Sequence, residues 1–308
     1  MKKKKKRKTF PRWIFIPAGF LLLLLFLFYG PFESFRLLWI NTAMYSSNHK
    51  FLARMFFTEK YIEKVLARNA PAEDRKTDVS VLINEWDDEI QFAEIKGNYY
   101  KGYIIKINDP KRLIFAQSDK TDGYLLEELT EMHNAYGGIN ASGYADARQR
   151  GIVWGTTIVD GQIVTGFSGD GKHVMGGFNS DYKLVVGRFS KEEIAIQNYL
   201  WAFEFGPLLI VNGEKMELTA FSGGLAPRTA IGQTAQGHVL LVVVDGRQVS
   251  SIGATFLDLQ TILFANGAIN AINLDGGASA SMVYQGKLIN SPSDGEAERL
   301  LPNAIIFR

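Results

Sequence analysis

The stretch AINLDGGASASM, residues 271–282, combines the pattern of a buried strand with residues suited to catalysis. The apolar run 268–274 predicts the strand, which delivers one acid, Asp275, into Gly276 and Gly277. Two consecutive glycines let the backbone turn sharply and let a ligand approach it closely. Successive free N–H groups in such a turn can bind an anion. The stretch therefore predicts a site for chemistry on a phosphorylated group, with a plain hairpin turn as the alternative.

The composition is that of a globular protein. The chain has 308 residues, of which 46% are hydrophobic and 21% charged, enough for one large domain or two small ones. Residues 1–12 hold eight Lys or Arg and no acid. Residues 13–308 contain the remaining 26 basic residues and 32 acidic ones, so their net charge is about −6. A general nucleic-acid surface is therefore not supported, and no nucleic-acid partner is expected. The absence of cysteine excludes disulfides, thiol catalysis and cysteine metal sites.

The N-terminal region predicts a membrane anchor. Residues 1–12 form a basic tail, and residues 13–30 are assigned as one transmembrane helix, because 13–29 contain no charge and have about the minimum length to span a bilayer. Basic residues on one side predict a single-pass protein with a cytoplasmic N-terminus and an extracytoplasmic main domain. A cleavable signal peptide is the alternative, but residues 30–33, Gly-Pro-Phe-Glu, make a poor cleavage site.

The rest of the chain divides into two parts. Residues 31–76 have mixed three- and four-residue apolar spacings that predict a helical stalk, followed by a polar, proline-containing linker. Residues 77–308 predict a single α+β domain with a mostly antiparallel twisted sheet and a few packed helices, because many short strand patterns alternate with few helical ones.

Four local features of this domain are specific enough to check. Val79–Ile83 reads as its first strand, and Thr121 or Asp122 reads as the cap of a helix that includes Leu125. Asp160-Gly161 and Gln285-Gly286 are hairpin signals.

Several glycine-rich motifs accompany residues 273–282. Each alone is weak, because turns between strands commonly contain glycine. The motifs are GGINASGYAD (137–146), FGPLLIVNG (205–213), RTAIGQTAQGHVLLVVVDGR (228–247) and LPNAIIF (301–307). Together, and in this order, they resemble the phosphodiester glycosidase family. The first motif departs from the common form Asn-Ala-Gly-(Phe/Tyr)-Phe by an inserted Ser142 and by Ala145, which affects the local geometry there.

This resemblance implies hydrolysis of a sugar joined to phosphate in a diester, which releases a sugar such as N-acetylglucosamine and leaves a phosphomonoester. A phosphate-linked surface glycan (teichoic acid, capsule or exopolysaccharide) would suit an exported, anchored enzyme. A non-catalytic glycan-binding or assembly protein of exopolysaccharide biosynthesis is the alternative function.

The residues of the motifs suggest roles. Asp275 is the first candidate for a general acid or base, and Asp146 is its candidate partner. Arg228 suits a phosphate diester because a guanidinium binds two oxygens at once, with a structural salt bridge as the alternative. Asn140 is assigned to a sugar hydroxyl or acetamido group, or else it ties a turn. Ser279 is predicted to hydrogen-bond the phosphate or to act as a nucleophile.

The remaining assignments complete the predicted site. The amides of Gly276 and Gly277 would hold phosphate, and Gly143, Thr229 and Asn303 are included among the substrate-binding residues because they lie in the matching motifs. None of the four histidines is expected to be catalytic, so a Ser–His–Asp triad is not expected.

Metal binding remains open at the level of sequence. No zinc motif is present, but Asp146 and Asp275 are candidate ligands for Ca²⁺ or Mg²⁺, and no cofactor is assigned with certainty. Glu204 is expected to face solvent.

Overall fold

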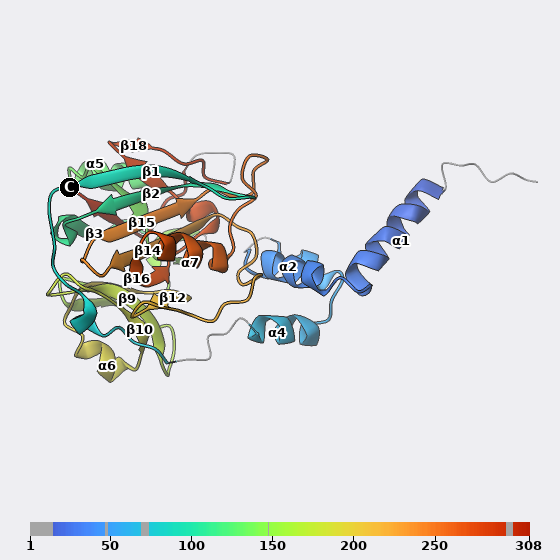
Figure 1. The fold of residues 1–308 in the computed structure, drawn as a ribbon, viewed down its shortest axis with the longest axis horizontal. Coiled ribbons are helices and arrows are strands. Elements are labelled where there is room, and N and C mark those ends of the chain that lie inside the picture. The colour runs from blue at the N-terminus through green and yellow to red at the C-terminus, as the bar shows by residue number, and fades with distance from the viewer. Residues whose placement is uncertain (1–14, 47–48, 69–73, 147, 294–297) are drawn as a thin grey trace, which may run out of the picture.

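The computed structural model describes residues 15–46, 49–68, 74–146, 148–293 and 298–308. These residues form a group of N-terminal helices and a larger domain built mainly of strands (Figure 1).

The strands of the domain form three sheets and one short ribbon. The first sheet contains β1 (Ile90–Lys96), β2 (Lys101–Ile107), β12 (Leu208–Val211), β13 (Glu214–Lys215), β14 (Arg228–Thr234), β15 (Val239–Val244) and β16 (Ala268–Asn273). The second contains β7 (Thr157–Val159), β8 (Gln162–Thr165), β9 (His173–Asn179), β10 (Leu184–Phe189) and β11 (Tyr199–Glu204). The third contains β3 (Leu113–Gln117), β4 (Gly137–Asn140), β17 (Met282–Tyr284), β18 (Lys287–Leu288) and β19 (Asn303–Phe307). The ribbon pairs β5 (Tyr144–Asp146) with β6 (Gln149–Val153).

All of these strand pairings are antiparallel. The sheets run β1-β2-β15-β14-β16-β12-β13, β10-β9-β11-β7-β8 and β18-β17-β4-β19-β3. Three helices accompany them: α5 (Leu126–Met132), α6 (Lys191–Ala195) and α7 (Phe256–Ala265). The predicted α+β class with mostly antiparallel sheets is therefore confirmed.

Strand β15 shows how the sequence builds two cores. All six of its residues are buried, and because side chains alternate along a strand, its two faces meet different neighbours. Val239, Leu241 and Val243 belong to the main core, to which all three sheets contribute. Leu240, Val242 and Val244 belong to the cluster that includes Leu259 and Leu263 of α7. The seven-stranded sheet is thus buried on both faces at its centre.

The local predictions have mixed outcomes. The two hairpins are confirmed: Asp160-Gly161 joins β7 to β8 and Gln285-Gly286 joins β17 to β18, with positive φ at all four residues. The strand predicted at Val79–Ile83 is wrong. Val79–Val81 is a 3-10 helix, because the Asp78 carboxylate accepts the Ser80 N–H at 2.9 Å and caps it.

The predicted cap of the helix after residue 121 is also wrong. Helix α5 begins at Leu126, and the Leu125 N–H donates to the Glu128 carboxylate at 2.8 Å. Tyr124 is unable to join the helix because it forms a β-bridge with Leu301. Thr121 lies in the preceding turn, where its carbonyl accepts the Gly151 N–H at 2.8 Å.

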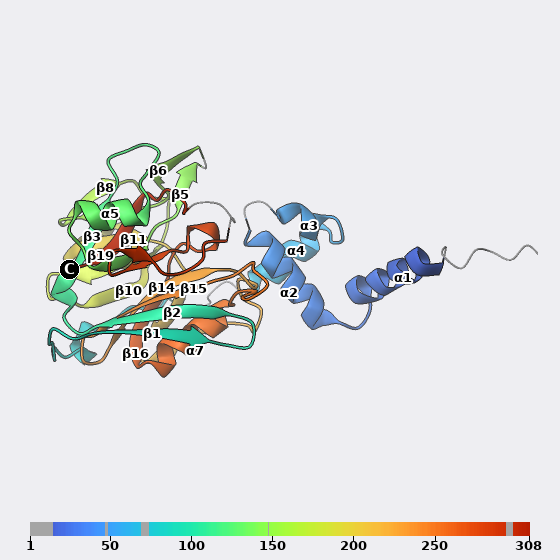
Figure 2. The same ribbon diagram turned by 90° about the horizontal axis from the view of Figure 1, so that it is seen from above.

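Four helices precede the domain: α1 (Phe15–Tyr29), α2 (Glu33–Met44), α3 (Lys50–Arg54) and α4 (Glu59–Ala67). Helices α2, α3 and α4 share a core that includes Ile40, Ala53 and Ile62. Phe28 of α1 stacks on Phe56 at 3.8 Å and meets Trp39 of α2 edge-on at 5.0 Å. Helix α2 reaches the domain, because the Leu225 N–H donates to the Thr42 hydroxyl at 3.1 Å. Figure 2 shows α1 extending away from the domain beyond the other three helices.

The predicted membrane segment is only partly described. Within the described residues, no single helix is both long and apolar enough to cross a bilayer; Gly19–Tyr29 and Glu33–Met44 meet the criteria only as a pair bent by 89°. The basic tail, residues 1–12, and most of the linker, residues 69–73, lie outside the described residues. The anchor at residues 13–30 stays a prediction.

Candidate active site

Asp275 lies where the central strand β16 leaves the seven-stranded sheet. Its N–H donates to the Ala141 carbonyl at 2.9 Å, and the preceding Leu274 N–H donates to the Thr229 carbonyl at 2.8 Å. The chain then turns through Gly276 into a 3-10 helix, η4 (Gly277–Ser279). A Cβ on Gly276 would lie 2.6 Å from the Pro227 carbonyl oxygen, so this tight turn requires glycine. Two sheets thus hold the backbone of the candidate catalytic acid.

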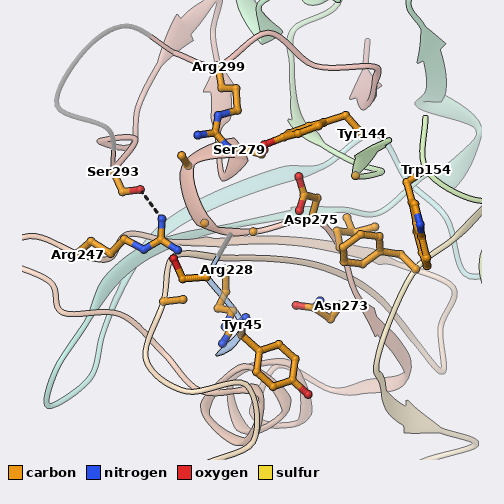
Figure 3. Close-up of a pocket in the computed structure, with 18 of the residues that line it drawn as sticks. Tyr45, Tyr144, Trp154, Arg228, Arg247, Asn273, Asp275, Ser279, Ser293 and Arg299 are labelled. Carbon is orange, nitrogen blue, oxygen red and sulfur yellow. Dashed lines mark hydrogen bonds between the residues drawn. The ribbon is translucent and has the colours of Figure 1, made fainter. Parts of the chain in front are cut away.

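A pocket of about 550 Å³ surrounds the Asp275 side chain (Figure 3). Its walls come from the loop after β16, from loops of the strand domain and from the end of helix α2. Its described lining includes Tyr45, Ser46, His49, Gly143, Tyr144, Trp154, Phe205, Arg228, Arg247, Phe256, Asn273, Gly276, Gly277, Ser279, Ser293 and Arg299. This volume is typical of sites for small molecules.

The Asp275 carboxyl has an environment that favours proton exchange near neutral pH. Burial raises the pKa of Asp275 to about 6, and interactions with Ser279, Arg299 and the Gly276 amide limit this rise. Gly143 lies directly against the carboxyl: a Cβ there would be 3.9 Å from an Asp275 carboxylate oxygen and 3.1 Å from the Phe205 ring. The absence of a side chain at residue 143 therefore keeps space open beside the acid.

Three arginines give the pocket a positive side. In Figure 3, Arg247 and Arg299 enter on one side of Asp275 and Trp154 on the other. Arg228 is buried; it donates to the carbonyls of Ala254, Gly223 and Gly224, and its guanidinium lies 4.2 Å from the Phe256 ring centre. Burial lowers the pKa of Arg228 to about 9, so it remains a cation at neutral pH. These cations suit a ligand that carries a phosphate.

Two buried polar atoms of residues that line the pocket lack a hydrogen-bond partner among the described residues. The Asn273 amide donates to the Gly206 carbonyl at 2.7 Å, but its Oδ1 has no hydrogen-bond partner among the described residues. The Ser279 hydroxyl lies close enough to Asp275 to lower its pKa, yet it too makes no well-aligned hydrogen bond within the described residues. Buried polar atoms without partners are rare, so these two are candidates for contact with substrate hydroxyl or phosphate groups.

Three of the predicted substrate-binding residues do not line the pocket but support it. Asn140 is fully buried; its Nδ2 donates to the Asp275 carbonyl at 2.6 Å, and its Oδ1 accepts from the Thr229 hydroxyl at 2.8 Å and the Ser281 N–H at 3.1 Å. Asn303 is also fully buried; its Oδ1 accepts the Ser142 N–H at 2.8 Å. The polar groups of Asn140, Thr229 and Asn303 are thus used inside the chain, which favours the turn-tying alternative for Asn140. The predicted substrate-binding roles of the three residues stay predictions.

One half of the predicted phosphate cradle, the Gly277 amide, is engaged within the chain. The Gly277 N–H donates to the Pro227 carbonyl at 2.9 Å, so it is not free to bind phosphate. Gly277 still lines the pocket with φ of +62°, and a Cβ there would lie 3.3 Å from the Arg247 guanidinium. Its structural contribution is thus to give Arg247 room. The side chain of Asp146 lies outside the described residues, and its predicted role stays a prediction.

Glu204, expected at the surface, is buried. Its carboxylate accepts hydrogen bonds from the Thr156 N–H at 2.9 Å, from the Ser168 hydroxyl and from His173 Nδ1 at 2.9 Å. Although burial acts to raise the pKa of Glu204, these hydrogen bonds lower it below its usual value. The arrangement ties the loop before β7 to β9 and β11. Among the described residues, no group of three or more His, Asp or Glu is placed to hold a metal ion.

Sequence reasoning missed several pocket residues. Arg247 lies in a matching motif directly after Asp245-Gly246, so its position carried a signal that was not used. Arg299 precedes the last motif by only two residues, but a lone arginine in a polar loop carries no such signal. Tyr45 comes from the stalk, and only the three-dimensional structure brings its ring within 5.6 Å of Phe256.

The chain is similar to known proteins over this region. The model of a protein family described as "Phosphodiester glycosidase" matches residues 133–308, which is more than half of the chain. An uncharacterized SPbeta prophage-derived protein, YomE, of Bacillus subtilis (strain 168) is 32% identical over 166 residues, 51% of this chain and 25% of YomE. Human N-acetylglucosamine-1-phosphodiester α-N-acetylglucosaminidase is 31% identical over 108 residues, 32% of this chain and 21% of the human protein. The chain thus matches a quarter or less of the length of these curated relatives.

Solved structures share the fold. The catalytic domain of zebrafish N-acetylglucosamine-1-phosphodiester α-N-acetylglucosaminidase, described as auto-inhibited by pro-peptide, aligns with a TM-score of 0.61 and 21% identity, covering 78% of this chain and 94% of that one. A putative exported protein of Burkholderia pseudomallei K96243 aligns with a TM-score of 0.52 and 16% identity, covering 68% of this chain and 74% of that one. At these identities the likeness concerns the fold.

Proposed function

Since the chain belongs to the phosphodiester glycosidase family, a family of hydrolases, we propose that it hydrolyses the bond between a sugar and a phosphate diester. The observation that carries this proposal is the pocket itself, where Asp275, a carboxyl with a raised pKa, faces the arginines at 247 and 299. N-acetylglucosamine is the proposed sugar, because the names of the mammalian relatives specify it.

The two sides of the pocket suit the two parts of such a substrate. The phosphate would lie on the side of Arg228, Arg247 and Arg299, whose charges offset its own. The sugar would lie toward Trp154 and Phe205, with the free Oδ1 of Asn273 accepting a hydroxyl. In this arrangement the bond between them falls beside Asp275.

The proposed role of Asp275 is that of general base. A phosphomonoester has a second pKa of about 6, so the departing group needs little protonation at neutral pH, whereas the attacking water must lose a proton. Asp275 ionises in the same range and is able to take this proton. Water then supplies the oxygen at the anomeric carbon, the carbon–oxygen bond breaks, and the phosphomonoester keeps the bridging oxygen.

The test measures both products. The full chain in detergent is incubated with the methyl phosphodiester of N-acetylglucosamine in ¹⁸O-water, with and without EDTA. Equal release of free sugar and methyl phosphate, with no ¹⁸O in the methyl phosphate by ³¹P NMR, is expected. Binding without release would favour a glycan-binding or assembly protein instead. A loss of activity in EDTA would assign a metal ion to the site.

The proposed base predicts a specific pH dependence. Because a phosphodiester does not titrate between pH 4 and 9, the profile of kcat/KM reports the free enzyme. As pH falls below about 6, Asp275 becomes protonated and kcat/KM is expected to fall about tenfold per unit, with a plateau above. A profile that instead falls as pH rises above 6 would show that Asp275 acts as a general acid.

The proposed location is the outer face of a cell membrane, with residues 13–30 as the anchor. Phe20, Leu22 and Phe26 of helix α1 are exposed, which supports insertion of this helix in lipid. The proposed substrates are then phosphate-linked surface glycans such as teichoic acid, capsule or exopolysaccharide.

A further inference from the structure

A second cavity of about 440 Å³ adjoins the candidate active site, and its walls are mainly apolar. Helices α2 and α3 supply Phe35, Leu38, Trp39 and Leu52, and loops of the strand domain supply Leu225 and Ile252. Most of these side chains are partly exposed, although burial would be favourable for each. An apolar cavity of this kind on a folded domain commonly marks a binding site.

The two cavities share part of their walls. Ser46, His49 and Arg247 line both of them. Ser46 and His49 hydrogen-bond to each other at 2.7 Å, and Arg247 is one of the cations proposed to face phosphate. A ligand whose phosphate lies at Arg247 therefore has the polar pocket on one side and the second, apolar cavity on the other. This second cavity is called the groove below.

The groove is carried by the helices that follow the exposed apolar helix α1. Only residues 30–32 separate α1 from α2, and Phe28 of α1 packs in the same aromatic cluster as Trp39. If α1 lies in lipid as proposed, the groove lies next to the membrane surface.

We propose that this groove binds the hydrocarbon chain of a lipid-linked sugar phosphodiester, in which the phosphate joins the sugar to a long-chain alcohol. The inference rests on the proposed hydrolase function and names its substrate class. Water adds across the linkage: the bond between the anomeric carbon and oxygen breaks, the sugar gains the hydroxyl, and the lipid leaves as its phosphomonoester. Asp275 takes the proton of water and returns it to solvent.

The test compares two diesters of N-acetylglucosamine phosphate that differ only in the alcohol, methyl or farnesyl. Each buried methylene adds about fourfold to affinity, so partial burial of the farnesyl chain is expected to raise kcat/KM by about 10²-fold. The full chain in mixed micelles is used for both. A wild-type protein that turns over the methyl diester as well as the farnesyl diester would overturn the inference.

Two variants place a charge in the groove from opposite walls, Leu38→Glu on α2 and Ile252→Glu on the domain. Ile252 is 50% exposed, so its variant is expected to fold even where the α2 variant does not. Both should reduce the farnesyl preference to near one and leave turnover of the methyl diester within about twofold. Met55→Glu is the matched control, because Met55, which directly follows α3, is 66% exposed and does not line the groove. An unchanged preference in Ile252→Glu would refute the site.

Binding separates this inference from the proposed function. The Asp275→Asn protein is titrated calorimetrically with both diesters, so that affinity is measured without turnover. Tighter binding of the farnesyl diester, abolished by Ile252→Glu, supports the groove even if neither diester is hydrolysed by the wild type. Hydrolysis of both diesters with equal affinities would leave the proposed function intact and refute the groove.

Discussion

Replacement of Asp275 by asparagine is expected to lower kcat by about 10²- to 10⁴-fold, the range that a positioned general base contributes. The amide has nearly the same shape as the carboxyl and is unable to accept a proton from water. The backbone at Asp275 is held by Ala141, and the Asn140 amide holds its carbonyl, so neither contact depends on the side chain. The measurement is single-turnover release of sugar from the methyl diester.

The stability of this variant is a second readout. Because burial raises the pKa of Asp275 to about 6, the folded state binds its proton more tightly than the unfolded state does. The ionised carboxyl therefore disfavours folding, and wild-type stability should fall as pH rises from about 4 to 6 and remain lower above it. Asp275→Asn removes this dependence, so above pH 6 it is expected to be at least as stable as the wild type.

A matched control is the buried Asp245. Its Oδ1 accepts from Asn290 at 3.1 Å and from the Ser291 N–H at 2.9 Å, and burial raises its pKa as well. Asparagine retains this acceptor, so Asp245→Asn should keep kcat within about threefold. Equal losses in both variants would mean that the Asp275 effect is structural, and full activity in Asp275→Asn would remove it from the mechanism.

Around Asp275, the structure predicted from the sequence motif agrees with the observed backbone. The apolar run before Asp275 forms the central strand β16, and the glycines after it make the turn at residues 276 and 277. Arg228, which opens β14, also lines the pocket. The strands that carry these residues could be predicted from the hydrophobic pattern. The placement of both residues in one site came from the resemblance of their motifs to the family.

Direction of a side chain was harder to predict than position. Asn140 and Asn303 lie in the right motifs, but at the end of β4 and the start of β19 their amides turn inward and hold other segments. Glu204 looked solvated because no residue near it in sequence reveals Thr156, Ser168 and His173 around it. Such partners depend on long-range packing, which local propensity does not report.

The contribution of the stalk could not be predicted for the same reason. The spacing of apolar residues indicated helices, but the same pattern fits a helix on a membrane, on a partner or on the domain itself. The contacts of Thr42 with Leu225 and of Tyr45 with Phe256 show that the stalk docks on the domain itself. The result is that two cavities, rather than one, have walls from the N-terminal helices.

Replacement of Asn140 by alanine is expected to destabilise the protein by about 2 to 5 kcal/mol, because three buried groups lose their partner at once. These groups are the Asp275 carbonyl, the Thr229 hydroxyl and the Ser281 N–H. The midpoint of urea unfolding measures the loss. Thr229→Val is the control: it removes one of the three hydrogen bonds and should cost about 1 kcal/mol.

The kinetics of this variant distinguish a positioning residue from a sugar-binding one. If Asn140 holds the turn that carries Asp275, Asn140→Ala lowers kcat together with stability, and KM changes little. The other role predicted from the sequence, a contact with the sugar, predicts the reverse: KM rises while the urea midpoint stays at the wild-type value. The Nδ2 and Oδ1 groups of Asn140 are both already used within the fold, so a lower kcat with little change in KM is expected. A higher KM at unchanged stability would require the loop at Asp275 to rearrange when substrate binds.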